Sequence, residues 1–379
     1  MVGTRSLSPR PAMSETASAI LTVDLAALAD NWRGLAERVA PAECAAVVKA
    51  DAYGIGAAPA ARALSAAGCG TFFVATAEEG AEIRGVLGPG ARLFAFNGVT
   101  NATSEDLVAH SVTPVLNHLG QIETWGDAAR SAETTLPAAL HLDTGMNRLG
   151  MPPEDVAVVR SEPAFLDGIA VELIVSHLAC SDEADHPMNG QQLVEFLRLK
   201  AAAPPAPASL ANSAGIYLGH EYHFDMPRPG IALYGGNPTP GAANPMAEVV
   251  RVQGRILQVR EIDSPRSVGY GAEFRAAGPT RIATVALGYA DGFLRSLGNH
   301  GMGSLGGVQV PIAGRVSMDL ITLDVTNAPA EAAVPGALVS LIGGGVDLDE
   351  LAEAAGTIPY EILTGLGRRY HRNYVNGSG

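Results

Sequence analysis

The sequence predicts an α/β protein in which an N-terminal (β/α)8 barrel of the TIM type precedes a C-terminal β-rich domain. Up to about Tyr234, short apolar runs alternate with Ala-, Leu- and Glu-rich segments of helical spacing, a pattern typical of parallel strands joined by helices. After the Gly-, Pro- and Asn-rich residues 235–245, short alternating segments separated by turn residues take over, which indicates antiparallel strands. The chain has 379 residues, more than a single core usually holds.

Eight apolar runs are the expected barrel strands, and eight is the number that closes such a barrel. They span residues 45–49, 72–75, 92–96, 113–116, 138–142, 171–176, 208–210 and 231–234. An open doubly wound sheet is the alternative, but no GxGxxG motif follows the first run, so the barrel is favoured.

The second domain is expected to hold strands at residues 249–262, 281–287, 308–312, 321–325 and 337–342, with helices at 348–355 and 359–367. We therefore divide the chain into a disordered leader (1–18), a barrel (19–245) and a β-domain (246–379). The leader is rich in Ser, Pro and Ala and lacks the apolar core of a secretory signal.

Charge and cysteine content exclude several classes of protein. The net charge is −14, from 25 basic and 39 acidic residues, which argues against nucleic-acid binding, although a local Arg cluster can still hold a small anion. Cys44, Cys69 and Cys180 form no CxxC pair, so we expect neither a disulfide framework nor a zinc site, and a reducing cytoplasm fits best. No apolar run approaches the ~20 residues that span a bilayer, so we expect no membrane association.

Several polar residues fall at the carboxyl ends of the expected strands, where barrel enzymes carry their chemistry. Lys49 ends the first strand, and partial burial there would lower the pKa of its amine and make it a usable nucleophile. The alternative is a surface lysine whose stem lies along apolar residues. The other residues at this rim are His141, Arg148, His177, Asn212, Ser213 and Arg228. His177 with Asp182, Asp185 and His186 could suggest a metal site, but their spacing matches no metal motif, and none is predicted.

Eight short motifs follow one another along the chain after the leader. They are Val48-Lys49-Ala-Asp-Ala-Tyr53-Gly, Leu142-Asp-Thr-Gly-Met-Asn-Arg148-Leu-Gly, Ala211-Asn-Ser213-Ala-Gly, Arg228-Pro-Gly230-Ile231-Ala-Leu-Tyr234-Gly, Val268-Gly-Tyr270-Gly, Gly288-Tyr289-Ala-Asp-Gly, Met318-Asp319 and Ile358-Pro-Tyr360-Glu. Together they resemble the motifs of the alanine racemase family, in the right order and over nearly the whole chain after the leader. The first motif resembles the segment by which these enzymes hold pyridoxal 5′-phosphate (PLP) as a Schiff base.

The resemblance implies a two-base racemisation, in which Lys49 serves one face of the substrate carbon and Tyr270 the other. Two bases are simpler than one that must swing across a planar carbanion. A tyrosine hydroxyl has a free pKa of ~10, so acting as a base near pH 7 requires stabilisation of the phenolate by roughly 4 kcal/mol. His177 and Arg228 are the expected supporting neighbours. A purely structural tyrosine is the alternative for Tyr270.

The resemblance also implies how the cofactor is held. Arg228 would face the pyridine nitrogen and keep it unprotonated, because Arg almost never gives up its proton. Arg148 would meet the phenolic oxygen and the substrate carboxylate, assisted by the Met318 backbone N–H. The phosphate would be bound by the backbone N–H groups of Gly230 and Ile231 and by the hydroxyls of Tyr53, Ser213 and Tyr360. An N-cap role for Ser213 and a tight turn at Gly230 remain compatible with this.

Tyr270, Tyr289, Met318 and Asp319 belong to the second domain, so the resemblance implies a homodimer with shared active sites. Sequence alone does not distinguish this from packing within one chain. Two positions depart from the family pattern: Ile55 replaces a frequent histidine, and His141 replaces a lysine that is carbamylated in many members. We expect His141, a water or a bound anion to position Arg148 instead, unless His141 is only a barrel histidine.

The predicted function is a PLP-dependent alanine racemase that interconverts L- and D-alanine and supplies D-alanine for peptidoglycan. A racemase of broader specificity and a PLP decarboxylase are the alternatives among enzymes. A PLP carrier without turnover is the alternative outside them, although such carriers resemble the barrel alone. Whether the role is biosynthetic or catabolic stays open.

Overall fold

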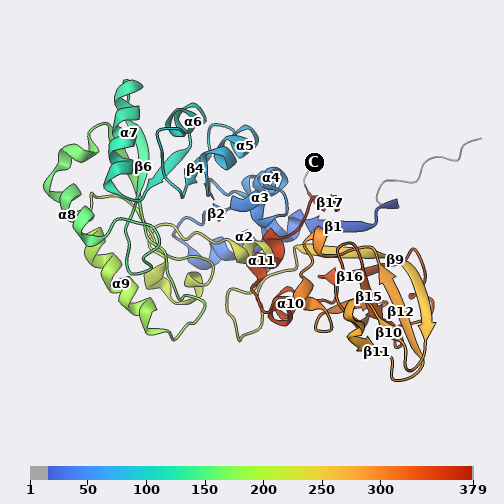
Figure 1. The fold of residues 1–379 in the computed structure, drawn as a ribbon. Helices are drawn as coiled ribbons and strands as arrows, with labels where there is room; N and C mark the ends of the chain where they lie inside the picture. Colours follow the sequence, from blue (N-terminus) through green and yellow to red (C-terminus); the bar gives the residue numbers. More distant parts are fainter. Residues whose placement is uncertain (1–15, 378–379) are drawn as a thin grey trace, which may run out of the picture. The chain divides into compact units, whose positions relative to one another are not determined.

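The computed structural model describes residues 16–377 and divides into two compact units (Figure 1). The barrel unit comprises Leu25–Val249 and the described end of the chain after Val375. The β unit comprises Val250–Val375 together with the described residues up to Asp24.

The barrel unit contains seven parallel strands that follow one another in sequence order, so the predicted fold class is confirmed. Most of the strand residues are buried, as expected for a parallel sheet covered by helices. The strands are β2 (Ala46–Val47), β3 (Thr71–Val74), β4 (Arg92–Ala95), β5 (Thr113–Leu116), β6 (Leu136–His141), β7 (Ile169–Val175) and β8 (Ala208–Ser209).

The prediction of an eighth strand at residues 231–234 is wrong, because Ile231–Tyr234 forms a short 3-10 helix, η4. A short, fully buried apolar run cannot be assigned to strand or helix from periodicity alone. The ring is closed by the preceding residues, where the N–H groups of Ala45 and Val47 donate to the carbonyls of Pro227 and Pro229, both at 3.0 Å. These prolines have no N–H to return, so the ladder stays one-sided.

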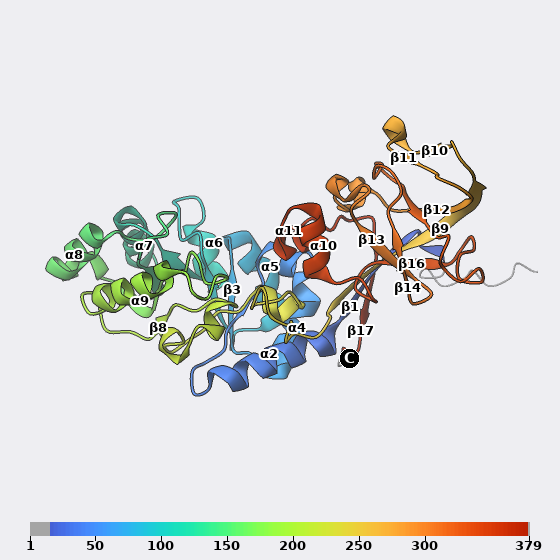
Figure 2. The same cartoon turned by 90° about the horizontal axis from the view of Figure 1, so that it is seen from below.

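Helices follow the strands and surround them (Figures 1 and 2). In α2 the buried residues Leu25, Leu28, Trp32, Leu35 and Val39 recur every three or four positions, the spacing of one helical face. The helices are α2 (Leu25–Val39), α4 (Ala57–Ala67), α5 (Ala77–Leu87), α6 (Ser104–Ala109), α7 (Leu119–Ser131), α8 (Pro153–Ser161) and α9 (Pro187–Lys200). The short segment α3 (Lys49–Tyr53) is a left-handed turn.

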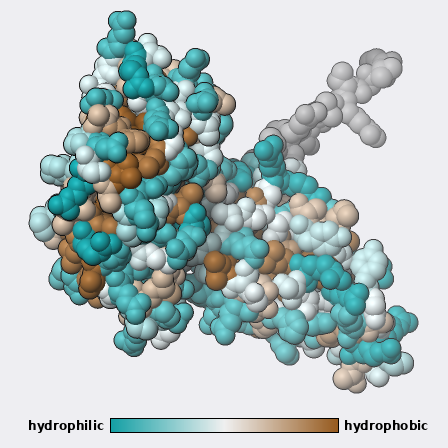
Figure 3. Space-filling model, turned by 60° about the vertical axis from the view of Figure 1, so that its left-hand side comes forward, coloured by the Kyte–Doolittle hydropathy of each residue, from teal (hydrophilic) through white to brown (hydrophobic). Residues whose placement is uncertain are grey.

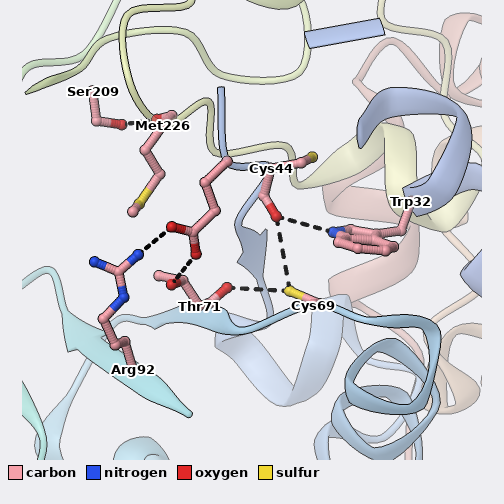
Figure 4. Close-up of polar contacts among 8 residues, drawn as sticks. Trp32, Cys44, Cys69, Thr71, Arg92, Ser209 and Met226 are labelled. Atoms are coloured by element: carbon pink, nitrogen blue, oxygen red, sulfur yellow. Dashed lines mark hydrogen bonds and ion pairs between the residues drawn. The ribbon is translucent and has the colours of Figure 1, made fainter. Parts of the chain in front are cut away.

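Polar contacts tie together the amino ends of β2, β3 and β4 (Figure 4). The Glu43 carboxylate accepts from Thr71 at 2.5 Å and pairs with Arg92. Burial raises the pKa of the Cys69 thiol to about 12, so Cys69 stays a protonated, unreactive thiol. In barrel enzymes this end of the strands serves stability rather than chemistry.

The β unit is built around the long strand β9, which pairs with β1, β12 and β16. The predicted strands at 249–262, 281–287, 308–312, 321–325 and 337–342 correspond to β9, β12, β14, β15 and β16. The strands of this unit are β1 (Ala19–Asp24), β9 (Val250–Ile262), β10 (Ser267–Val268), β11 (Phe274–Arg275), β12 (Thr280–Val285), β13 (Met302–Leu305), β14 (Val308–Pro311), β15 (Ile321–Asp324), β16 (Leu338–Ile342) and β17 (His371–Val375).

The start of the chain departs from the predicted division. Ala19–Asp24, expected in the barrel, forms β1 and pairs antiparallel with β9 and parallel with β17. The carbonyls of Ala17 and Ser18, expected in the disordered leader, accept hydrogen bonds from Arg255 at 2.9 and 2.8 Å. The rest of the predicted leader, residues 1–15, lies outside the described residues.

Two helices complete the β unit, α10 (Leu348–Ala355) and α11 (Pro359–Thr364). Asp347 caps α10 by accepting from the backbone N–H groups of Asp349 and Glu350, at 2.9 and 3.0 Å.

The face drawn in Figure 3 shows hydrophobic residues in separate patches among hydrophilic ones. Within residues 16–377, no helix combines the length and the hydropathy needed to cross a bilayer.

Candidate active site

Lys49 directly follows β2, at the carboxyl edge of the parallel sheet. The next four residues, Ala50 to Tyr53, form a left-handed turn with φ between 50° and 56°, and none of them is a glycine. Each such residue costs ~1–2 kcal/mol, so the surrounding contacts must hold the turn in place. Strain of this kind concentrates at functional sites.

The environment of Lys49 lowers the pKa of its amine, mainly through burial and then through the charge of Arg148, while Glu79 opposes the shift. The ammonium nitrogen lies 5.8 Å from the centre of the Phe96 ring. The lowered pKa agrees with the shift expected at a buried strand end. It increases the fraction of Lys49 that carries a neutral, nucleophilic amine at a given pH.

Arg228 lies buried on the segment that closes the barrel. Its guanidinium donates to the Ser209 hydroxyl and, at 2.6 Å, to the Ser176 carbonyl, and it lies 5.9 Å from the Phe73 ring centre. Burial lowers its pKa to about 10, which still leaves it protonated at pH 7. Within the described part of the chain no carboxylate pairs with it, so its positive charge is held by neutral groups alone.

Two histidines stand at neighbouring strand ends, His141 on β6 and His177 after β7. Burial, followed by the charge of Arg228, lowers the pKa of His141 to about 4. The same two causes hold the pKa of His177 well below its usual value. Both rings are therefore neutral at pH 7 and can accept as well as donate a hydrogen bond.

A hydrogen-bond chain fixes which nitrogen of His141 carries the proton. His141 Nδ1 lies 2.7 Å from Asn117 Oδ1. The Asn117 amide nitrogen donates to the carbonyls of Phe96 and Val115 at 3.1 and 2.8 Å, so its oxygen must be the acceptor. His141 Nδ1 then bears the hydrogen, and Nε2 is left with an open lone pair. Gln121 braces the amide through its own side-chain oxygen.

Ser213, Gly230, Ile231 and Tyr53 form a small cradle beside β2. Ser213 Oγ accepts the N–H of Gly230 at 2.8 Å and that of Ala232 at 3.3 Å, so its own hydroxyl hydrogen can still point to a ligand. A Cβ at Gly230 would collide with the Tyr53 hydroxyl, so only glycine fits. The Ile231 N–H has no partner among residues 16–377. A hydroxyl donor, a backbone donor and the absence of bulk suit a phosphate group.

Arg148 projects from the loop 143–150, which is closed at its base by the pairing of Leu142 with Met151. Asp143 Oδ1 accepts from the backbone of Gly145 at 2.9 Å and of Asn147 at 3.2 Å. The Arg148 side chain is exposed and makes no hydrogen bond to any described residue, so it is available to a ligand.

The β unit brings the other predicted residues to its own surface. Tyr270 lies between two left-handed glycines and is 71% exposed. Tyr289 and Met318 lie side by side, because the N–H of Ala290 donates to the Met318 carbonyl at 2.9 Å. Asp319 pairs with Arg369 at 2.6 Å, so its carboxylate is already engaged. Tyr360 lies in the first turn of α11, partly exposed.

Four residues near these sites were not singled out from the sequence: Glu79, Asn117, Gln121 and Asp291. Asp291 is buried and binds Arg369 through both oxygens, each at 2.7 Å. Only Glu79 carries a recognisable signal, because Thr76 and Glu79 match the capping-box spacing. Among the residues described, no three His, Cys, Asp or Glu side chains form a group that could hold a metal ion.

The barrel edge thus combines a lysine of lowered pKa, two arginines, two neutral imidazoles and a glycine cradle. Positive charge together with free donors suits a phosphorylated, anionic cofactor, and the lysine amine offers a covalent attachment point. These features define an enzyme of the kind that binds PLP on a barrel and carries a β-rich second domain.

Comparison with known proteins identifies the family. The model of the alanine racemase N-terminal domain matches residues 23–238, and that of the alanine racemase C-terminal domain matches residues 249–374. The chain is 51% identical to the alanine racemase of Rhodospirillum rubrum over 361 residues, which are 95% of this chain and 96% of that one. It is 48% identical to the catabolic alanine racemase of Agrobacterium fabrum over 359 residues, 95% and 92% of the two chains.

Solved structures agree with this. The alanine racemase of Bartonella henselae with covalently bound pyridoxal phosphate has a TM-score of 0.90 and 40% identity, covering 95% of this chain and all of the other. The chain belongs to the alanine racemase family, and it is a PLP-dependent isomerase. The predicted family, enzyme class and cofactor are confirmed.

Proposed function

We propose that this alanine racemase works with two bases, Lys49 on one face of the substrate Cα and Tyr270 on the other. The observation that carries the proposal is the environment of Lys49: burial and Arg148 lower the pKa of its amine, at the end of a strand followed by a strained turn. The bound cofactor supplies the electron withdrawal that makes the α-proton acidic. Lys49 Nζ then holds or returns a proton on its own face, and Tyr270 Oη does so on the opposite face.

The cradle supports the proposed binding of the cofactor phosphate by the Ser213 hydroxyl, the Ile231 N–H and Tyr53, with Gly230 providing space. Tyr360 is proposed as a further hydroxyl donor to the phosphate. The proposed partner of the pyridine nitrogen is Arg228, whose fixed guanidinium donates a hydrogen bond and keeps that nitrogen unprotonated. His177, neutral and near Arg228, would support the phenolate of Tyr270.

Arg148 would bind the cofactor's phenolic oxygen and the substrate carboxylate, with the backbone N–H of Met318. Tyr289 would limit the room for the substrate side chain. Asp319 is held by Arg369, so its proposed role is to shape the rim next to Met318. A racemase of broader specificity differs from this proposal only in the space left near Tyr289.

We propose that each active site is shared between two copies of the chain, as a homodimer. Tyr289 and Met318 lie side by side and are 42% and 55% exposed, and neighbouring exposed apolar side chains are a feature of interaction surfaces. Tyr270 is 71% exposed. Mixing inactive Lys49→Ala and Tyr270→Ala proteins should restore one intact site per heterodimer. No recovery after verified subunit exchange would refute sharing.

Reduction of the holoenzyme with borohydride, followed by peptide mapping, tests the attachment point. A pyridoxyl label on Lys49 alone is expected, and a label elsewhere would remove the basis of the mechanism. Incubation with single L-amino acids in deuterated water, followed by chiral analysis, then gives the substrate range. Tyr270→Phe should abolish racemisation equally in both directions, because the equilibrium constant between the two enantiomers fixes the ratio of the rates, while cofactor absorbance persists. Exchange of the α-proton with deuterated water should then remain for one alanine isomer, through Lys49, and be lost for the other. Only mild loss of racemisation, with exchange kept for both isomers, would exclude Tyr270 as a base.

We further propose that the enzyme acts in the cytoplasm and supplies D-alanine for peptidoglycan. Cys44, Cys69 and Cys180 are free thiols, which supports the first part, because disulfides are rare in a reducing cytoplasm. Of the relatives, that of Rhodospirillum rubrum is named alanine racemase and that of Agrobacterium fabrum is named a catabolic one. Deletion of the gene distinguishes the roles: a requirement for added D-alanine supports cell-wall supply, and growth without it supports a catabolic role.

A further inference from the structure

Glu79 occupies an unusual position at the start of α5, where its carboxylate bridges two strand ends. One oxygen accepts the N–H of Ala50 at 2.7 Å, and the other accepts the N–H of Ala75, also at 2.7 Å. Ala50 directly follows Lys49, and Ala75 directly follows β3. The carboxylate therefore joins the helix start to the carboxyl ends of two neighbouring strands.

This arrangement is more than a helix cap. In a capping box the Glu side chain returns to the N–H of its own cap residue. Here the first half of that motif is present, because Thr76 Oγ1 accepts the Glu79 N–H at 3.3 Å. The carboxylate, however, turns away from Thr76 towards the first residue of the left-handed turn. Hydrogen bonds from N–H groups to a carboxylate are about twice as strong as neutral ones.

The bond to Ala50 acts where the backbone is most strained. Ala50 has φ 53° and ψ 51°, a conformation that alanine avoids. At the other side of the turn, Asp51 Oδ1 accepts the N–H of Ala57 at 2.7 Å. Two carboxylates thus hold the turn from opposite sides, and its geometry determines where the Lys49 side chain leaves the backbone.

We propose that Glu79 is a positioning residue for the cofactor lysine: it locks the turn after Lys49 and places a negative charge near the amine, against the positive charge of Arg148. This rests on the proposed role of Lys49 as the cofactor attachment point. The charged and titratable groups that act on or near this amine are Arg148 from the loop after β6, His177 after β7, and Glu79 from α5. His177 is neutral, so Glu79 is the anionic member of this set.

Two substitutions separate the geometric effect from the charge effect. Glu79→Gln removes the charge and leaves one oxygen for two N–H groups. Glu79→Asp keeps the charge, but it is one methylene shorter and cannot reach both. Glu78→Gln is the matched control, because Glu78 precedes Glu79 in the same helical turn and is exposed.

The first measurement is the apparent pKa of Lys49 in the cofactor-free full-length protein, from competitive acetylation at a series of pH values read by mass spectrometry. The second is the dissociation constant for PLP. Glu79→Gln should lower the apparent pKa of Lys49 and weaken PLP binding roughly tenfold. Glu79→Asp should weaken binding with little change in that pKa, and Glu78→Gln should change neither.

The proposal would be overturned if both Glu79 variants bound PLP with dissociation constants within twofold of that of Glu78→Gln and had the same apparent Lys49 pKa as that control. If Glu79→Gln fails to fold, Glu79→Asp decides: weaker PLP binding at an unchanged thermal midpoint supports positioning, and unchanged binding refutes it. The borohydride map keeps the two proposals apart. A label on another lysine refutes the role of Lys49, whereas a label on Lys49 with unaltered Glu79 variants refutes only the role of Glu79.

Discussion

Gly230→Ala tests the cradle most directly, because it adds a single carbon at a position where the structure leaves no room. The new Cβ would collide with Tyr53 Oη and lie 2.9 Å from Tyr53 Cζ. The backbone of Gly230, at φ −125°, is not in the left-handed region, so the effect comes from the contact and not from φ. Gly230 also donates to Ser213 at 2.8 Å, so any shift is passed to the proposed phosphate donor.

The magnitude follows from how little Tyr53 can move. Its ring is buried and stacks on Tyr234, with 4.5 Å between ring centres. The Tyr234 hydroxyl is itself fixed by the Val47 carbonyl at 2.8 Å. Forcing an extra methyl group into such packing costs ~1–3 kcal/mol. We expect this loss in the free energy of unfolding, together with roughly tenfold weaker PLP binding.

Urea unfolding of the cofactor-free protein and PLP titration measure the two effects. Tyr53→Phe removes the colliding oxygen, so Gly230→Ala should cost about 1 kcal/mol less in that background. Gly34→Ala is the control: Gly34 is exposed in α2 with no atom near its would-be Cβ, and alanine there should stabilise by ~0.5–1 kcal/mol. A Gly230→Ala protein of unchanged stability and affinity, or costs that simply add, would refute the cradle geometry.

Three further predictions concern His141 and Asp291. Long-range 1H–15N spectra should show His141 protonated at Nδ1, and Asn117→Leu should abolish this preference; an Nε2 proton in the parent protein would contradict the assignment. The pKa of His141 is near 4 in the folded protein instead of 6.5. Between these two pH values the unfolded state binds more protons at His141 than the folded state, so the free energy of unfolding decreases as the pH falls from 6.5 towards 4. His141→Gln should reduce this slope by up to about 1.4 kcal/mol per pH unit in urea unfolding, and an unchanged slope would count against the shift. Asp291→Ala removes the acceptor of the Gly288 N–H and one of the two carboxylates that bind Arg369, while Asp319 stays bound, so calorimetry should show a loss of about 1–3 kcal/mol in the free energy of unfolding. Asp347→Ala at the N-cap of α10 is the capping control and should cost about 1 kcal/mol.

The sequence predicted the repeating part of the fold better than its ends. Seven barrel strands and the long β9 were predictable, because burial on both faces or on alternate faces produces readable apolar patterns. β1 was assigned to the wrong unit, since its partners β9 and β17 lie more than 200 residues further along the chain. Pairing over such a separation leaves no local signal.

The hydrogen bonds of the site were also not predictable from the sequence. Lys49, Arg228 and the cradle residues could be proposed from strand ends and from the family resemblance. The hydrogen-bond partners of their polar groups could not. Gly230 illustrates this: its N–H was expected to bind phosphate, and in the structure it donates to Ser213 Oγ, while that bond leaves the Ser213 hydroxyl hydrogen available. A motif identifies the residue, but only the three-dimensional structure shows which of its polar groups already have a hydrogen-bond partner.

His141 shows what such a contact can decide. A histidine in this position could carry a positive charge and repel Arg148, or stay neutral and accept from it. Burial and Arg228 hold the ring neutral, and Asn117, itself fixed by Gln121 and two carbonyls, takes the Nδ1 hydrogen. The remaining lone pair on Nε2 is therefore an acceptor, and the exposed Arg148 is a donor whose charge already acts on His141. A neutral acceptor can thus orient Arg148 without any covalent modification, provided that Asn117 keeps the ring in this tautomer.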